Sequence, residues 1–181
     1  SLISYTVGKH MLYLSYIKIV KLEGQPFQGL NYVQELGLAG NYLTELCKGV
    51  FTGLSMLSCL YIDHNQLVHL YDDSFEGLVM LQTLALFYNK LTTLPVCLFR
   101  KVSYSLTHLS LDRNNIISLP DTIFHELDEL KTLNIGLNQV LSLNESIFDR
   151  LAGLNSLYLN DNYLISLPDT IFHELDELKT L

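Results

Sequence analysis

The sequence predicts an α/β solenoid: a right-handed stack of coils with a concave parallel β-sheet on one side, and loops and short helical turns on the convex side. Two series of residues predict this class. Seven of the eight phenylalanines recur at steps of 24 or 25 residues, as Phe27, Phe51, Phe75, Phe99, Phe124, Phe148 and Phe172. An asparagine recurs in the same register, as Asn41, Asn65, Asn89, Asn114, Asn138 and Asn162. A fixed period of this length indicates repeats that bury their apolar faces against one another.

The period makes the whole chain, residues 1–181, one domain with no Pro-, Gly- or Ser-rich linker. Residues 1–11 are expected to form an N-terminal edge. Seven repeats follow at about 12–32, 33–56, 57–80, 81–105, 106–129, 130–153 and 154–177, and residues 178–181 begin a further, truncated repeat. The first repeat carries Ile17 where the others carry asparagine, so we expect it to begin the stack.

Each repeat combines a strand with a returning segment. In the stretch Thr83–Leu86, Leu84 and Leu86 alternate with Thr83 and Ala85, as in a half-buried strand. The rest of the repeat is too short for a long helix, so a turn and short helical or irregular structure are expected. A buried Leu or Phe contributes about 1.5–3 kcal/mol, against roughly 1–2 kcal/mol of backbone ordering per residue, so coils are stable only when stacked.

The asparagine series predicts a structural ladder inside the stack. A buried amide without partners costs about 1–3 kcal/mol. An amide that points inward at the end of a strand can instead bond turning backbone groups of its own coil and the adjacent one. We therefore expect these six side chains to be buried and hydrogen-bonded.

The repeat resembles a known family. The pattern L-x-x-L-x-L-x-x-N-x-L-x-x-L-P-x-x-x-F-x-x-L, present as LTHLSLDRNNIISLPDTIFHEL at 106–127, is similar to the typical 24-residue leucine-rich repeat, and the resemblance covers about residues 12–181. Its Leu-Pro version, also at Leu94-Pro95 and Leu167-Pro168, most resembles extracellular receptors: Toll-like receptors, Slit-like proteins and the variable lymphocyte receptors of jawless vertebrates. The resemblance implies a horseshoe fold and a role in ligand recognition, including immunity.

Side chains that project from the strands away from the core change type from repeat to repeat, whereas the core letters hardly change. Tyrosine is enriched among them, as in antibody-like binding surfaces. We therefore predict a protein ligand on the concave face, in contact with Tyr13, Tyr16, Tyr42, Tyr61, Asp63, His64, Phe87, Tyr88, His108, Asp112, Arg113, Tyr158, Asp161 and Tyr163. The alternative is that strands favour aromatic residues in any case, and an exposed tyrosine needs no ligand.

Other classes of function receive little support. The net charge of −8 argues against nucleic acid as a partner. His108, Ser110 and Asp112 have the letters of a catalytic triad, but they occupy alternate strand positions about 7 Å apart on an open sheet. Asp63 and His64 are neighbours in sequence, and partner ligands for a metal would lie about 10 Å away. We expect no enzyme activity, metal or cofactor.

The setting of the domain has two interpretations. An extracellular or cell-surface ectodomain agrees with the resemblance and with the glycosylation acceptor Asn144-Glu-Ser146 on an outer segment. An intracellular scaffold or adaptor would explain Cys47, Cys59 and Cys97, which form no C-x-x-C pair. No apolar run reaches the length of a membrane span, and the chain, which begins without Met and ends inside a repeat, is interpreted as part of a longer protein.

The seventeen residues ISLPDTIFHELDELKTL occur twice, at 117–133 and 165–181. Packing explains why the apolar residues recur, but outward positions such as Asp121 and Glu126 are free to vary. Identity at these free positions indicates recent copying of a block of two repeats.

Overall fold

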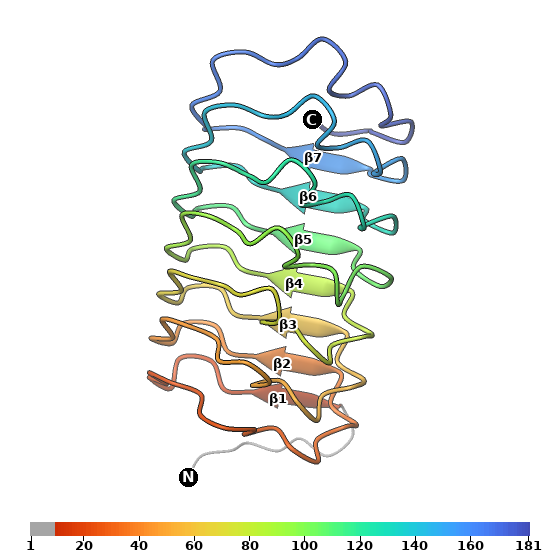
Figure 1. Cartoon of the computed structure of the whole chain (residues 1–181). Coiled ribbons are helices and arrows are strands. Elements are labelled where there is room, and N and C mark those ends of the chain that lie inside the picture. Colours follow the sequence, from red (N-terminus) through yellow and green to blue (C-terminus); the bar gives the residue numbers. More distant parts are fainter. Residues whose placement is uncertain (1–9) are drawn as a thin grey trace.

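A computed structural model describes residues 10–181; most of the predicted N-terminal edge, residues 1–9, lies outside the described residues. The fold is a stack of coils with one short strand each (Figure 1). The strands are β1 (Met11–Tyr13), β2 (Glu35–Gly37), β3 (Cys59–Tyr61), β4 (Thr83–Ala85), β5 (His108–Ser110), β6 (Thr132–Asn134) and β7 (Ser156–Tyr158). They form one parallel sheet in the order β1 to β7, so neighbours in sequence are neighbours in space.

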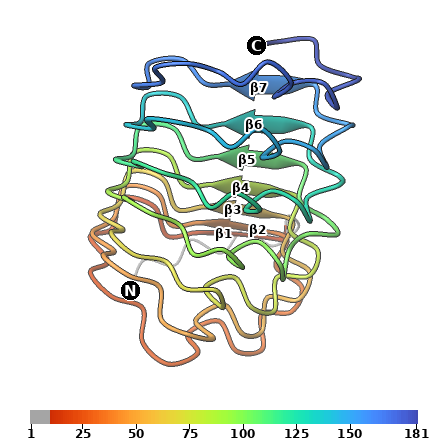
Figure 2. The same cartoon turned by 45° about the horizontal axis from the view of Figure 1, so that its top comes forward.

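The register of the sheet follows the repeat period. The middle residue of every strand is a buried leucine, and these leucines pair with one another from strand to strand, as Leu36 does with Leu60. Figure 2 shows the strands along one side of the stack and the connecting segments looping away from them. The predicted parallel sheet and solenoid are confirmed.

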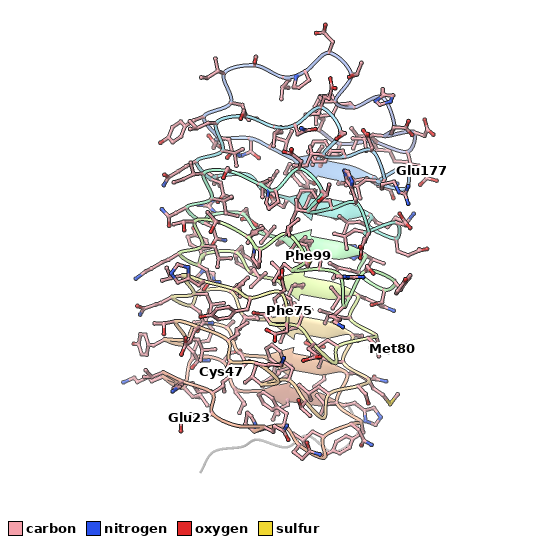
Figure 3. The ribbon with its side chains drawn as sticks, viewed as in Figure 1. Glu23, Cys47, Phe75, Met80, Phe99 and Glu177 are labelled. Atoms are coloured by element: carbon pink, nitrogen blue, oxygen red, sulfur yellow. The ribbon has the colours of Figure 1, made fainter. Side chains whose placement is uncertain are left out.

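The phenylalanine series forms a spine inside the coils. Successive rings stack with centroids 6.2–6.4 Å apart and interplanar angles of 10–17° in five pairs, from Phe27–Phe51 to Phe148–Phe172. Among residues 10–181, only the step from Phe75 to Phe99 has no such stacked pair. Figure 3 shows these two rings inside the molecule, whereas Glu23, Met80 and Glu177 project from its perimeter.

The asparagine series lies beside this spine and ties each coil to the preceding one. The Oδ1 atom of Asn114 accepts the N–H of Leu91, and its Nδ2 donates to the carbonyls of Leu86 (3.0 Å) and Leu111 (2.9 Å). The other five make the equivalent bonds. All are buried except Asn162, which is half-buried in the last complete coil. Within the described part, every buried side-chain nitrogen and oxygen has a hydrogen-bond partner.

The convex side differs from expectation, because residues 10–181 contain no helix. The connecting segments are turns closed by isolated bonds between residues three apart, such as Leu127 N–H to Phe124 O (3.0 Å) and Leu151 N–H to Phe148 O (2.9 Å). Each turn must deliver a phenylalanine and a leucine to the core, so the backbone does not continue into a run of helical bonds. It follows that no helix in this range could cross a membrane.

Candidate recognition surface

The side of β1–β7 that faces away from the core, together with the residues just after each strand, is called the sheet face below. The first and third residues of each strand lie on it, and the middle leucine points inward. Of the fourteen residues of the predicted recognition surface, four lie in the strands themselves, Tyr13, Tyr61, His108 and Tyr158, and the other ten lie in the segments that follow the strands. The sheet places them in a continuous row of coils without bringing all of them into contact.

At the N-terminal end, large and small residues alternate across the sheet. Tyr13, Gly37, Tyr61 and Ala85 occupy equivalent positions on β1–β4. A Cβ atom added to Gly37 would lie 2.8 Å from Cδ1 of Tyr13, so the tyrosine ring leans over the glycine. Gly37 is therefore buried beneath Tyr13; Ala85 is also buried, and Tyr61 is half-buried.

Two tyrosines of this end have perturbed hydroxyls. Tyr13 donates to Oε1 of Glu35 at 2.6 Å, and this bond to a carboxylate is the main cause that raises the pKa of Tyr13 to about 12. Burial is the main cause of the raised pKa of Tyr61. Glu35 was absent from the predicted set; its outward position on β2, one period after Met11 and next to the strand that carries Tyr13, is the signal that could have revealed it.

The centre of the face carries a cluster of rings from the loops that follow β3, β4 and β5. The His64 ring stacks on Tyr88 with centroids 4.5 Å apart and an interplanar angle of 25°. Phe87 meets His64 edge-on at 5.3 Å, and the guanidinium carbon of Arg113 lies 4.9 Å from the centroid of Tyr88. These four residues, His64, Phe87, Tyr88 and Arg113, are called the aromatic cluster.

Two carboxylates flank the cluster. Asp63 is buried, and its Oδ2 lies 2.8 Å from Nδ1 of His64, so it orients the imidazole rather than facing solvent. Asp112 is half-buried in the register next to Phe87. Burial raises the pKa of Asp112, while its own backbone N–H and the nearby Arg113 oppose the shift.

The C-terminal part of the face carries several polar residues. Gly136 donates its N–H to Oδ1 of Asn134 at 3.0 Å, and Asn160 donates to Asp161 at 2.6 Å. Tyr158 and Tyr163 are exposed in the same last coil. Gly136 adjoins the aromatic cluster, because its carbonyl accepts the backbone N–H of Arg113 at 3.1 Å. Tyr158 on β7 and Tyr13 on β1 each lie two strands from the strands that carry the cluster, so they lie at the two ends of the predicted surface.

The remaining predicted residues lie beside those described above. Tyr42 is exposed just after its ladder asparagine. His108 is exposed at the start of β5, and its Nδ1 lies 2.8 Å from the hydroxyl of its neighbour Thr107, not from Ser110. His108, Ser110 and Asp112, whose residue types match a catalytic triad, are thus not arranged as a triad.

Comparison with known proteins identifies the class that this fold and surface define. The family model for the leucine rich repeat matches residues 10–67, 31–91 and 104–164, and the chain belongs to that family. No curated protein matches the sequence significantly.

Two solved structures place the chain among relatives. A leucine-rich-repeat protein of Leptospira interrogans is 32% identical with a TM-score of 0.75, over 84% of this chain and 37% of that one. TLR13, solved in a complex with ssRNA13, is 27% identical with a TM-score of 0.78, over 86% of this chain and 22% of that one. The chain therefore spans well under half the length of either relative.

Proposed function

We propose that this chain is a recognition module that binds a protein ligand on its sheet face, the concave side of the stack, as part of an extracellular receptor ectodomain. The observation that carries the proposal is the aromatic cluster. Its rings already contact one another on an open sheet, and three of its four side chains are exposed. Aromatic and arginine side chains of this kind supply most of the binding energy in protein interfaces.

The charge of the sheet face favours protein over nucleic acid. The carboxylates of Glu35, Asp112 and Asp161 lie on it, with buried Asp63 beside them, so the cations Lys18, Lys90 and Arg113 are not in excess. Binding to a phosphate backbone depends on an excess of lysine and arginine. Since TLR13 was solved with an RNA, capture of RNA is retained as a competing outcome of the test below.

The extracellular setting is supported by the likeness to TLR13 and by Asn144, which is exposed and accepts bonds from the N–H (2.9 Å) and hydroxyl (2.8 Å) of Ser146. An intracellular scaffold is the second candidate, favoured by three free, half-buried cysteines. Expression of the chain through a secretory pathway distinguishes them. A glycan on Asn144 that Asn144→Gln removes supports the ectodomain; secreted, folded chain without it favours the scaffold.

Site-directed photo-crosslinking tests the binding surface. A photoreactive phenylalanine analogue replaces Tyr61 or Tyr88 on the sheet face, with exposed Tyr71 and Tyr104 in connecting segments as matched controls. We expect one protein to be captured in cells from the sheet positions only. Capture from the control positions alone contradicts the proposal, and a nuclease-sensitive product identifies RNA instead.

A further inference from the structure

The residue before each ladder asparagine, and before Ile17 at the same position of the first repeat, adopts a left-handed backbone conformation. These residues, the left-handed column, have φ between 50° and 65°: Tyr16, Gly40, His64, Tyr88, Arg113, Leu137 and Asp161. Hydrogen bonds to the next coil hold the backbone there, as when Tyr88 N–H donates to Asp112 O at 3.1 Å. The conformation is disfavoured for residues with a Cβ atom and favourable for glycine.

Gly40 shows that glycine fits this position in the fold. The Tyr16 ring occupies the space that a Cβ atom at Gly40 would need, so neighbouring coils accommodate the glycine. The fold by itself would therefore accept glycine throughout the column. Instead, the centre of the column carries a histidine, a tyrosine and an arginine, each in a conformation that opposes it.

Contacts between these three side chains offset part of that strain and fix their orientation. His64 covers one face of the Tyr88 ring, and the guanidinium of Arg113 also lies against this ring. A ligand of the sheet face therefore contacts the edge of this stack of three side chains. Asp63 anchors the His64 end. All three side chains are exposed, and the N–H groups of Arg113 among them only donate hydrogen bonds.

We propose that His64, Tyr88 and Arg113 form the specificity-determining element of the sheet face and that they bind planar hydrogen-bond acceptors of a protein ligand, namely main-chain carbonyls and side-chain amides. The inference rests on the function proposed above. Carboxylates fit less well, because Asp112 occupies the neighbouring position on the same face. Other residues of the column, such as Leu137, have the same backbone strain, so the contacts of the His64, Tyr88 and Arg113 side chains are what distinguish the stack.

Glycine substitution separates folding from binding. Tyr88→Gly and Arg113→Gly are compared with Leu137→Gly, which lies in the same column at φ 53° but outside the stack. All three variants keep the midpoint of thermal unfolding within about 4 °C of the unaltered chain. Arg113→Lys retains the charge without the planar group.

The binding probe is a phage-displayed library of random peptides, enriched on the unaltered chain. The enriched clones should lose at least about tenfold in affinity for Tyr88→Gly, Arg113→Gly and Arg113→Lys, and bind Leu137→Gly normally. The inference is overturned if the clones bind all four variants equally. It is also overturned if the library gives no clones that prefer the unaltered chain to Tyr88→Gly. So does selective unfolding of Tyr88→Gly, which would assign the ring to packing.

The two proposals can fail separately. Clones that respond to Tyr61→Ala and Phe87→Ala, but not to the glycine variants of the stack, contradict this inference and leave the sheet face as the binding surface. Clones that respond to none of these changes contradict both.

Discussion

Residues 117–133 and 165–181 have the same seventeen letters but different surroundings. In the first copy Phe124 and Leu133 are fully buried; in the second Phe172 is half-buried and Leu181 is 67% exposed. The first copy lies between coils, whereas the described residues cover only one side of the second (Figure 1). Identical sequence thus gains its burial from the next coil.

The two copies differ at some positions and agree at others. Ile123 and Ile171 are equally buried, at 3% and 2% exposure, so the burial of this position does not depend on a following coil. The histidines diverge: Nε2 of His125 lies 2.9 Å from the Ser146 carbonyl of the next coil. His173 instead contacts Thr170 and Glu174 of its own coil. Phe124 and His125 therefore depend on the following coil, whereas Ile123 does not.

The largest expected effect is on the phenylalanine spine. Phe124→Ala removes a ring stacked on both sides and should lower the free energy of unfolding by about 3–5 kcal/mol. Phe172→Ala should cost less than half as much, since its ring stacks only on Phe148 within the described chain. Urea denaturation measures both, and equal losses would contradict the role of the neighbouring coil.

The asparagine ladder gives the next contrast, between positions 48 residues apart. Asn114→Leu should lower the free energy of unfolding by about 1–3 kcal/mol, because it leaves buried backbone groups of two coils without hydrogen-bond partners. At half-buried Asn162 water can replace the lost bonds, so Asn162→Leu should cost less. A loss below a few tenths of a kcal/mol for Asn114→Leu would contradict the ladder's role in stability.

The histidines should show a smaller difference. His125→Ala removes a bond between coils and should cost about 0.5–1.5 kcal/mol in thermal unfolding. His173→Ala removes only exposed contacts within one coil, so a change within about 0.5 kcal/mol is expected. A larger loss at His173 would reverse the comparison.

The smallest effect concerns Asp112, whose counterpart one block later is Asn160. Because burial raises the pKa of Asp112 in the folded chain, its ionised form opposes folding above that pKa. Asp112→Asn should therefore raise stability at pH 7 by about 0.5 kcal/mol or less, given its partial exposure. The gain should disappear as the pH falls through about 4, where the carboxyl is protonated in both states. A gain independent of pH would point to another cause.

The residues that recur in each repeat were sufficient to predict the overall architecture. Leucine and phenylalanine spacing predicted the strands and solenoid, because a two-residue alternation and a 24-residue period admit few other arrangements. The turns on the convex side were not predictable in the same way. Their course depends on how each phenylalanine enters a core shared with two other coils.

The sequence predicted which positions form the candidate site, but it did not predict the contacts between their side chains. The stack of His64, Tyr88 and Arg113 depends on the left-handed backbone and on the 25-residue step between Phe99 and Phe124, which keeps Arg113 in register with Tyr88. Such cross-coil contacts become apparent only when neighbouring coils are placed together.

The most direct test of the account compares the two surfaces in one titration. A protein captured by the Tyr61 or Tyr88 crosslink is purified and titrated against Tyr61→Ala and Phe87→Ala, and against Glu126→Ala and Glu129→Ala on the outer face, with thermal unfolding of each variant. We expect each sheet-face change to weaken binding at least about tenfold at nearly unchanged stability, and the outer-face changes to have no effect. Loss of binding by the outer-face pair, with the sheet-face pair unaffected, would place recognition on the opposite side of the molecule.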